Sequence, residues 1–586
     1  MKKMQKAMRE FDRLKKQLKK IEEAAGNAKD SGLWSHEASV RKKIKQLREL
    51  KDKQIPEYDA LYQGYLELLD NISVRLLNHY NKKNGTNYRF EDIVENNRRI
   101  YINTGIISVL TTVHIPSLVA EEFERYFPQN PKDEYEKARK LKRKVILHLG
   151  QTNTGKTYQA VERLKQASNG VYLAPLRILA LENFEKLNRE GVPCNLITGE
   201  EEILVENARH VCSTVEKVDI NQFYEVAVID EIQMIGDSQR GDAWTRALLG
   251  LQCAEMHICG AINAKELLIN ILNDCGDYFE IQEYVRQTPL KVWNDPFSLK
   301  DVEKGDALVA FSKKRVLELS KLFNERGIKN SVIYGDLPPE VRRMQYQAFL
   351  SGASKILITT DAIGMGVNLP IRRIIFMSLQ KFDGEEVRYL TSQEIKQIGG
   401  RAGRKGIYDV GYVGVHGYDQ DFLRLNLEMD DDPIEQAVLG PSEAILKIKG
   451  MPLKEKLALW STREEQIRLY TKMDIRDYLL VLDNIKYFKL PEEVEYALMK
   501  LPFDVNDEEM MEFFLGYVEE YFRKTKGQIT RPAYSARTLS EAEKYYQKLN
   551  LYYSFCKNFG IDFDADWVYK QRAKISEEIN RLLLKL

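Results

Sequence analysis

The sequence has few cysteines, no long apolar run and almost no net charge. Six cysteines occur among 586 residues, and none forms a C-x-x-C pair or lies at zinc-type spacing from a histidine. A disulfide framework and a zinc site are therefore not expected, whereas a reducing compartment is. The absence of any run of about 18 apolar residues gives no sign of a membrane-spanning helix.

The first 20 residues give no targeting signal. They lack the apolar core of a secretory signal and contain Glu10 and Asp12, whereas transit peptides are poor in acidic residues. We therefore expect a cytoplasmic protein. The formal net charge is +1, with 88 basic and 87 acidic residues, so an anionic partner must be met by local patches. One patch lies in residues 1–55, which contain 17 Lys or Arg and 8 Asp or Glu.

A chain of 586 residues that is 44% hydrophobic is too long for one core and can bury several. Residues 1 to about 140 show helical periodicity. The apolar residues of the first helix recur at spacings of three and four: Met4, Ala7, Phe11, Leu14, Leu18 and Ile21. This basic helix either packs its stripe on the body with lysines in solvent, or forms an arm that touches a nucleic-acid backbone.

From about residue 144 the pattern changes to short apolar strands alternating with amphipathic helices. This alternation predicts parallel sheets covered by helices on both faces. Helical periodicity returns after residue 434. The predicted strands are Lys144–Leu149, Gly170–Ala174, Val226–Ile229 and Met256–Cys259, then Ala307–Phe311, Ser331–Tyr334, Lys355–Thr359, Arg373–Met377 and Tyr412–Val415.

A glycine-rich turn follows the first predicted strand. Its spacing, Gly150-x-x-x-x-Gly155-Lys156-Thr157, is that of the phosphate-binding loop between a buried strand and a helix. The glycines let backbone N–H groups surround phosphate oxygens, and the helix N-terminus adds partial positive charge. The lysine binds the β and γ phosphates, and the threonine hydroxyl binds Mg²⁺. The motif predicts nucleotide binding but not the reaction.

Two carboxylates follow another apolar strand, at Asp230 and Glu231. A carboxylate downstream of a phosphate loop can hold the magnesium, and its neighbour can orient or deprotonate the attacking water. We assign these roles to Asp230 and Glu231 in that order, with Glu231 also close to the metal. Such a pair on its own would more often be a helix cap.

The second alternating region lacks a phosphate loop but contains Gln397-Ile-Gly-Gly-Arg401-Ala-Gly-Arg404. We predict that the two arginines lie on one face of a helix, because they are three residues apart. Planar guanidinium groups suit the charge on transferring phosphoryl oxygens, so they are candidate arginine fingers. A nucleotide bound between the two α/β regions would meet both motifs.

Together these motifs resemble those of a superfamily 2 helicase. The residues within them are similar to those of the SUV3 family of RNA helicases. The match is strong from about 145 to 420 and weaker over Leu539–Leu586. The residues that carry it are Gly150–Thr157, Ala174–Arg177, Thr198–Glu200, Ser213–Glu216, Asp230–Gln233, Tyr334–Pro339, Thr360–Asn368 and Gln397–Arg404.

The resemblance implies an α/β fold with two tandem RecA-like domains flanked by helical domains. We expect an N-terminal helical domain at 1–140, an ATP-binding RecA-like domain at 141–285, a second RecA-like domain at 286–430 and a C-terminal helical domain at 431–586. It also implies an ATP-driven translocase with Mg²⁺ that moves 3′ to 5′ on the single-stranded tail of an RNA duplex. RNA turnover is the expected process, and an exoribonuclease is a candidate partner.

Residue roles carry over motif by motif. The resemblance implies catalytic roles for Glu231, Gln397, Arg401 and Arg404, and metal binding by Thr157, Asp230 and Glu231. It implies nucleotide binding by Gly150, Thr152, Asn153, Thr154, Gly155, Lys156, Thr157 and Asn368. It implies nucleic-acid backbone contacts by Arg177, Thr198, Thr214, Gly335 and Thr360. Backbone contacts suit translocation, which must not depend on base sequence.

Two departures from the family and two alternatives remain. Where the family has Cys-Gly-Glu, this chain has Cys259-Gly260-Ala261, and only a short hairpin is possible around Asp383-Gly384. A DNA helicase or translocase is one alternative, because backbone contacts distinguish RNA only where a 2′-hydroxyl is recognised. A nucleotide-switched scaffold that binds without processive unwinding is the other.

Overall fold

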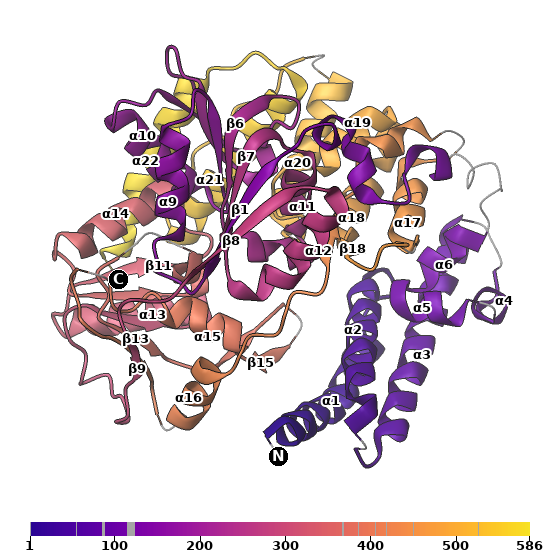
Figure 1. Cartoon of the computed structure of the whole chain (residues 1–586). Coiled ribbons are helices and arrows are strands. Elements are labelled where there is room, and N and C mark those ends of the chain that lie inside the picture. Colours follow the sequence, from indigo (N-terminus) through magenta and orange to yellow (C-terminus); the bar gives the residue numbers. More distant parts are fainter. Residues whose placement is uncertain are drawn as a thin grey trace. The chain divides into compact units, whose positions relative to one another are not determined.

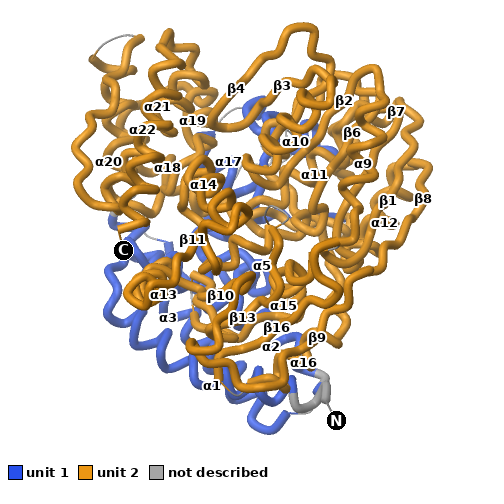
Figure 2. The backbone as a smooth tube through the Cα atoms, turned by 90° about the vertical axis from the view of Figure 1, so that its left-hand side faces the viewer, with its two compact units in different colours: residues 1–128, 441–466 blue, residues 129–440, 467–586 orange. Residues whose placement is uncertain are grey.

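The chain forms two compact units (Figure 2). The first consists of residues 1–128 and 441–466, and the second of residues 129–440 and 467–586. Within the described parts, no helix is both long and apolar enough to cross a membrane. The computed structural model describes residues 2–53, 55–84, 88–95, 97–113, 123–365, 369–384, 386–404, 406–417, 419–448, 451–463, 465–524 and 527–585.

The first unit is helical, as the sequence predicts. The apolar stripe of helix α1 packs in the core of this unit, where Ala7, Phe11 and Leu14 are at most 5% exposed. Its opposite face carries lysines and arginines in solvent. The α-helices described in this unit are α1 (Lys2–Asn27), α2 (Trp34–Leu50), α3 (Tyr58–Asn84), α4 (Phe90–Val94), α5 (Arg98–Thr104), α6 (Ile106–Val113) and α17 (Leu453–Thr462).

The first sheet of the second unit has eight strands in the order β4-β3-β5-β2-β6-β7-β1-β8. All neighbours are parallel except β3 and β4. Its strands are β1 (Lys144–Gly150), β2 (Gly170–Ala174), β3 (Cys194–Ile197), β4 (Glu202–Ile203), β5 (His210–Thr214), β6 (Phe223–Ile229), β7 (Gln252–Gly260) and β8 (Tyr278–Tyr284).

Helices cover both faces of this sheet (Figure 1). Side chains alternate along β2: Val171 and Leu173 join the core beneath α11 (Gly241–Gly250) and α12 (Lys265–Cys275). Tyr172 and Ala174 join the core beneath α9 (Lys156–Lys165) and α10 (Arg177–Arg189). A strand buried on both faces gives a continuous apolar run, which is why the central strands could be predicted. The short helix α8 (Glu136–Arg139) precedes the sheet.

The second sheet has six parallel strands in the order β11-β12-β10-β13-β16-β9. Helix α13 (Lys313–Glu325) packs on one face and α15 (Ser392–Gly399) on the other. All nine strands predicted for the two sheets are present. The strands here are β9 (Leu290–Val292), β10 (Asp306–Val309), β11 (Asn330–Ile333), β12 (Ile356–Thr359), β13 (Arg373–Phe376) and β16 (Gly411–Val415). Helices α14 (Pro339–Leu350) and α16 (Gln420–Glu428) complete this domain.

The C-terminal helices belong to the second unit. Helices α21 (Leu539–Phe559) and α22 (Ala565–Leu583) join the same core as α13 on the second sheet. From α21, Ala542, Tyr546 and Leu549 are buried in this core, and Leu539 is partly buried against it. The remaining elements are α18 (Arg476–Ile485), α19 (Glu492–Met499), α20 (Glu508–Glu519) and the strand pairs β14 (Gln380–Phe382) with β15 (Val387–Tyr389) and β17 (Ala437–Leu439) with β18 (Tyr470–Lys472).

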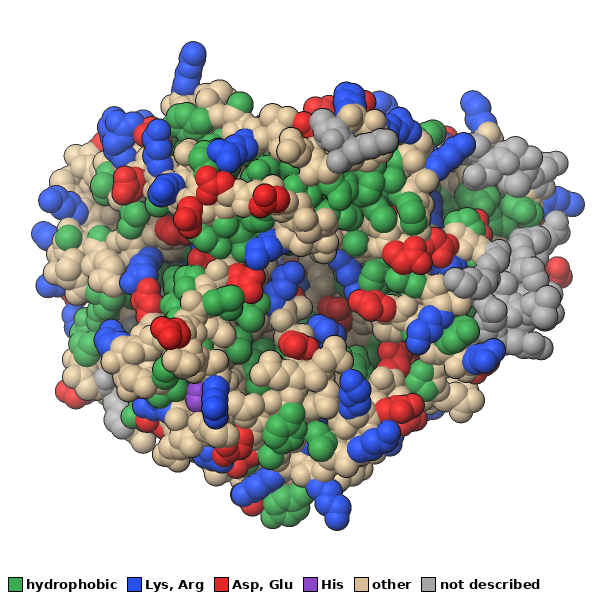
Figure 3. Space-filling model, turned by 90° about the horizontal axis from the view of Figure 1, so that it is seen from above, with side chains coloured by type: hydrophobic (Ala, Val, Ile, Leu, Met, Phe, Trp, Pro, Cys, Tyr) green, Lys and Arg blue, Asp and Glu red, His purple; other side chains and the backbone are tan. Residues whose placement is uncertain are grey.

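The two sheets with their helices are two tandem RecA-like domains, as predicted. The four-domain division of the chain stays a prediction, and the structure groups residues 441–466 with the N-terminal helices. On the face in Figure 3, basic and acidic side chains are interspersed rather than gathered by sign. The nearly equal numbers of basic and acidic residues in the chain are thus also seen as a mixture of both signs on that face (Figure 3).

Candidate functional site

Strand β1 leads directly into the predicted phosphate loop, and α9 begins within the loop at Lys156. Gly155 and Asn153 have φ values of 87° and 63°, in the left-handed region. Glycine adopts this region at little cost, and asparagine tolerates it better than most residues. At Gly150 the constraint is space, because a Cβ would lie 2.1 Å from the carbonyl oxygen of Tyr284. These glycines therefore permit a tight turn and a close approach.

Lys156 is held inside this loop. Its Nζ donates hydrogen bonds to the carbonyl oxygens of Gly150 and Gln151, each at 2.6 Å. Burial lowers the pKa of Lys156, and nearby Glu231 and Asp230 offset part of that effect. A phosphate group would give this buried cation the anionic partner that neutral carbonyls do not supply.

Thr157, in the first turn of α9, and Asp230, directly after β6, form an oxygen-rich pair. The Thr157 hydroxyl donates to Asp230 Oδ1 at 3.0 Å, and the Tyr172 hydroxyl donates to Oδ2 at 2.8 Å. Burial and the neighbouring Glu231 raise the pKa of Asp230 to about 6. The donor set fits Mg²⁺, which prefers oxygen ligands and would stabilise the ionised carboxylate.

Glu231 lies in a strained turn, and Gln233 bonds both to its carboxylate and to the backbone after β7. Its φ is 51°, a left-handed conformation that is unusual for a non-glycine residue and typical of functional sites. Its carboxylate accepts a hydrogen bond from Gln233 Nε2, and Gln233 Oε1 accepts one from the backbone N–H of Ala261 at 3.0 Å. Gln233 therefore fixes the orientation of the proposed base and links it to the end of β7.

The prediction that Arg401 and Arg404 share a helical face is wrong. Helix α15 ends at Gly399, and both arginines lie in the turn that follows. Gly403 in this turn has a φ of 74°, which a helix cannot accommodate. Arg401 Nη2 lies 3.9 Å from Glu231 Oε1, and Arg401 Nε donates to the carbonyl of Gly364 at 3.1 Å. The structure thus brings the guanidinium of the second domain to the carboxylate of the first.

Thr152 connects the phosphate loop to the last turn of α15, and Asn153 connects it to the turn that follows this helix. The Thr152 hydroxyl donates to the carbonyl of Lys396 at 3.3 Å, and Asn153 Nδ2 donates to the carbonyl of Gly403 at 3.3 Å. Between them, a Cβ on Gly400 would lie 2.1 Å from Thr152 Oγ1. Two of the four loop positions that the general motif leaves open therefore make contacts between the domains.

A cavity of about 1180 Å³ lies between the two RecA-like domains. Among the described residues, Arg404 is not part of its lining, and Asn368 lies outside the described residues. The predicted residues that line it are Gly150, Thr152, Asn153, Thr154, Gly155, Lys156, Thr157, Asp230, Glu231, Gln397 and Arg401.

The five predicted nucleic-acid contacts lie apart from this cavity lining. Each follows the carboxyl end of a parallel strand: Arg177 after β2, Thr198 after β3, Thr214 at the end of β5, Gly335 after β11 and Thr360 after β12. Two of them order their own turns, because Thr198 Oγ1 accepts from the N–H of Glu201 at 3.0 Å and Thr360 Oγ1 from that of Ala362 at 3.3 Å. Their contact with nucleic acid stays a prediction.

Three residues of the site had no role in the sequence analysis. Gln233 was part of a quoted motif, but its two bonds depend on β7, which only the fold brings beside it. Tyr172 lies in an apolar strand, where a buried hydroxyl gives no separate signal. Arg286 lines the cavity and donates to the carbonyls of Thr288, Gly400 and Ala402. Nothing in the local sequence marks it.

Three domain families match the chain. Residues 131–284 match the DEXQ-box helicase domain of Suv3, and residues 294–406 match the helicase conserved C-terminal domain. Residues 539–585 match the C-terminal domain of the ATP-dependent RNA helicase SUV3. The last of these covers α21 and α22, which pack on the second sheet.

Several curated proteins are similar over most of the chain. The mitochondrial DExH-box ATP-dependent RNA helicase DExH16 of Arabidopsis thaliana is 43% identical over 386 residues, which is 64% of this chain and 67% of that protein. The mitochondrial ATP-dependent RNA helicase SUV3 of Oryza sativa subsp. japonica is 38% identical over 445 residues, 71% of this chain and 76% of that protein. The match to SUPV3L1 of Danio rerio, at 38% identity, covers 67% of this chain but only 54% of that protein.

Among solved structures, Saccharomyces cerevisiae Dbp5 bound to RNA and ADP BeF3 aligns with 55% of this chain and 95% of that chain, at 18% identity and a TM-score of 0.38.

The prediction of a cytoplasmic protein is wrong, because the three curated relatives above are mitochondrial proteins by name. That prediction was based on the cysteine content and on the first 20 residues. A low cysteine content indicates a reducing compartment, which need not be the cytoplasm. The domain matches and the relatives agree, and the chain belongs to the SUV3 family of ATP-dependent RNA helicases.

Proposed function

We propose that the chain hydrolyses ATP to move 3′ to 5′ along the single-stranded tail of an RNA duplex. The observation that carries the proposal is the set of contacts between the two domains. Arg401 lies close to Glu231, Thr152 bonds to the last turn of α15, and Asn153 bonds to the turn that follows it. A nucleotide bound in this cavity is in contact with both domains, so its binding and hydrolysis change their relative position. RNA turnover beside an exoribonuclease is part of the proposal.

Five of the predicted residues at the cavity have the following roles in this scheme, and among the described residues Arg404 lies outside the lining. Lys156 and the loop N–H groups would hold phosphates, and Thr157 and Asp230 would hold Mg²⁺, which would offset phosphate charge. Glu231, oriented by Gln233, accepts a proton from the attacking water. Arg401 stabilises the developing charge on the γ phosphate.

The residues at the carboxyl ends of the strands supply two sets of RNA contacts. Arg177, Thr198 and Thr214 belong to the first domain, and Gly335 and Thr360 to the second. Two sets on two moving domains can hold the backbone alternately, which is the requirement for translocation.

The first unit offers a further RNA contact along α1. Its basic residues recur at spacings of three and four on the face opposite the buried stripe: Lys6, Arg9, Arg13, Lys16 and Lys20. The apolar face is used up inside the unit, since Phe11 and Leu14 are at most 3% exposed. This argues against a membrane-surface helix, which would need that face for lipid. We include this row, called the α1 basic stripe, among the RNA contacts.

The first prediction concerns the proposed base. Glu231→Gln should retain ATP binding and lose at least about a hundredfold in ATP turnover, because the amide cannot accept the proton. RNA-stimulated phosphate release and binding of a fluorescent ATP analogue measure the two effects. Glu206→Gln, an exposed change in the same domain, is the control. Near-normal turnover in Glu231→Gln would refute the role.

The second prediction concerns the joint between the domains. Gly400→Ala should raise the half-saturating ATP concentration about tenfold, because the new Cβ would lie 2.1 Å from Thr152 Oγ1 and 2.5 Å from the Lys396 carbonyl. Gly516→Ala, in α20 with no atom within 4 Å of its Cβ, should leave that concentration unchanged. An equal response of the two variants contradicts the importance of this contact.

The third prediction separates RNA from DNA and a motor from a scaffold. Poly(U) should stimulate ATP turnover more than poly(dT), and 3′-tailed RNA duplexes should be displaced faster than 5′-tailed ones. Equal or greater stimulation by DNA supports the DNA alternative. ATP binding without strand displacement on any tailed duplex supports the scaffold.

The fourth prediction concerns the α1 basic stripe. Replacing Arg9, Lys16 and Lys20 by Gln should reduce the slope of log affinity against log salt by about 2 for single-stranded RNA, since each phosphate contact contributes about 0.7. Fluorescence anisotropy from low to moderate salt measures this. Lys314, Lys321 and Lys329, exposed in the second RecA-like domain, give a control with the same charge change. Matching slopes for the two triple variants would leave the stripe as a solvated face.

A further inference from the structure

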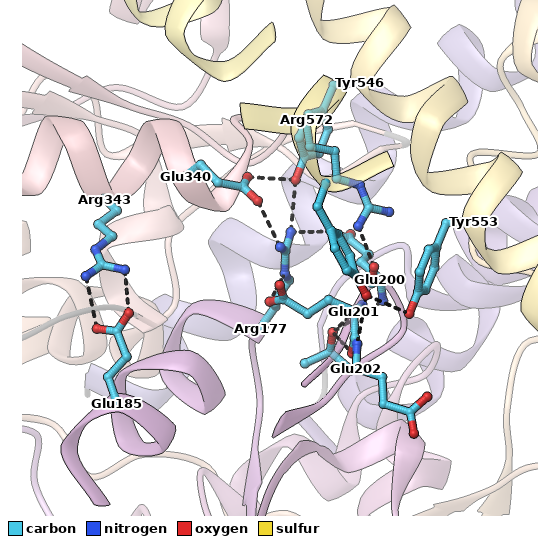
Figure 4. A network of polar contacts seen from close by, with 12 residues as sticks. Arg177, Glu185, Glu200, Glu201, Glu202, Glu340, Arg343, Tyr546, Tyr553 and Arg572 are labelled. Atoms are coloured by element: carbon cyan, nitrogen blue, oxygen red, sulfur yellow. Dashed lines mark hydrogen bonds and ion pairs between the residues drawn. The ribbon is translucent and has the colours of Figure 1, made fainter. Parts of the chain in front are cut away.

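Arg177, the first residue of α10, is surrounded by partners on every edge of its guanidinium group (Figure 4). Nε donates to Glu201 at 2.9 Å, Nη1 to Glu200 at 2.6 Å, and Nη2 to Glu340 at 2.8 Å. Nη1 also donates to the Tyr546 hydroxyl at 2.9 Å. The side chain is only 10% exposed. A residue predicted to hold RNA is thus occupied by three carboxylates and a phenol.

These partners come from three parts of the second unit. Glu200 and Glu201 follow β3 in the first RecA-like domain, Glu340 lies in the first turn of α14 in the second, and Tyr546 lies in α21. Tyr546 joins two of them, because its hydroxyl accepts from Arg177 and donates to Glu340 Oε2 at 2.7 Å. Both functions of the hydroxyl are therefore used in one fixed orientation.

The groups around Arg177 keep both the guanidinium group and the Glu340 carboxylate charged. Burial opposes the charge on Arg177, but Tyr546, Glu200 and Glu340 more than offset it and raise its pKa. Burial also opposes ionisation of Glu340, yet Arg177 and the Tyr546 hydroxyl lower its pKa, so it is a carboxylate. A guanidinium group binds carboxylate and phosphate oxygens with the same planar geometry. An RNA phosphate could therefore take the place of one of these carboxylates.

The C-terminal helices also hold the turn that carries Glu200. Ser554 in α21 donates to the carbonyl of Gly199 at 3.1 Å, and Arg572 in α22 donates to the carbonyl of Glu200. Lys557 pairs with Glu202 at 2.8 Å. The segment 198–202, which includes the predicted RNA contact Thr198, is thus fixed from outside its own domain. Figure 4 shows Tyr546 and Arg572 next to each other, above Arg177 and Glu200 in that view.

Glu340 differs from the other two carboxylates in its position. It is the partner from the second RecA-like domain, so its bond to Arg177 crosses between the domains. A second cross-domain pair of opposite polarity lies nearby, where Arg343 of α14 meets Glu185 of α10 at 2.5 and 3.0 Å. If the bond between Glu340 and Arg177 were lost, the Arg343–Glu185 pair would still connect α10 and α14. One edge of the Arg177 guanidinium group would then be released.

We propose that Tyr546 is a positioning residue for the RNA backbone contact of Arg177, and that Glu340 occupies Arg177 until an RNA phosphate replaces it. The proposal rests on the proposed function, because it assumes that Arg177 binds RNA. It gives the C-terminal helices a role at the RNA contact of the first domain, and it makes RNA binding an exchange of anions rather than an addition.

Tyr546→Phe tests the positioning role, because it removes only the hydroxyl. It should raise the half-saturating RNA concentration for ATP hydrolysis about tenfold, the scale of a hydrogen bond to a charged group. The half-saturating ATP concentration should not change. Tyr545→Phe, a neighbour in α21 whose hydroxyl does not contact Arg177 in the described structure, is the matched control. Equal effects of the two variants, or no effect of Tyr546→Phe, would overturn this role.

Glu340→Gln tests the exchange, because the amide still accepts hydrogen bonds but carries no charge. It should lower the half-saturating RNA concentration by roughly fivefold, since phosphate then displaces a weaker partner. A purely structural role predicts the opposite sign, so weaker RNA binding by Glu340→Gln would overturn the exchange. Thermal melting of each variant checks that the fold is retained.

The Arg177→Ala variant distinguishes a failure of this proposal from a failure of the proposed function on which it rests. If RNA stimulates the unmodified protein and Arg177→Ala raises the half-saturating RNA concentration, the proposed contact stands whatever the outcome at Tyr546 and Glu340. If RNA does not stimulate ATP hydrolysis at all, the proposed function fails first.

Discussion

The carboxyl ends of parallel strands meet at one edge of a sheet, and both proposed sites of this protein depend on that geometry. In the first sheet the phosphate loop follows β1 and the Asp230-Glu231 pair follows β6, while Arg177 and Thr198 follow β2 and β3. Residues far apart in sequence become neighbours because every parallel strand begins at the opposite edge. The helices that return the chain cover the two faces and leave this edge to the functional side chains.

The second constraint is how closely the two domains approach at the phosphate loop. The space between Thr152 and Gly400 admits no Cβ, and the arginine turn beyond α15 bonds directly to the loop. An interface this tight transmits small changes, because packed backbone segments shift as units rather than deform gradually. Glu231 lies at this interface in a left-handed conformation, so its geometry depends on both the β6 turn and Gln233.

Much of the fold and of the nucleotide site could be predicted because the signals are local. Buried strands such as β2 give continuous apolar runs, and the phosphate loop is defined by residues within one turn. The short edge strand β4 and the contacts of Arg286 could not be predicted, because they depend on residues brought together only by the fold. The helix expected through Arg401 and Arg404 ends early because Gly399, Gly400 and Gly403 favour a turn. The occupation of Arg177 by Tyr546 joins residues 369 apart in sequence, which no local pattern encodes.

The first unit is built from two separate stretches of chain, residues 1–128 and 441–466. Helix α17 packs with α5 and α6, and it buries Leu457 and Trp460. During synthesis the N-terminal helices therefore cannot complete their packing until α17 is made, which happens only after both RecA-like domains. The chain also crosses between the units three times, near residues 128, 440 and 466, so the units are tied by three covalent links rather than one hinge. Removing the N-terminal helices alone would expose the apolar face of α17, so these helices are not a detachable appendage.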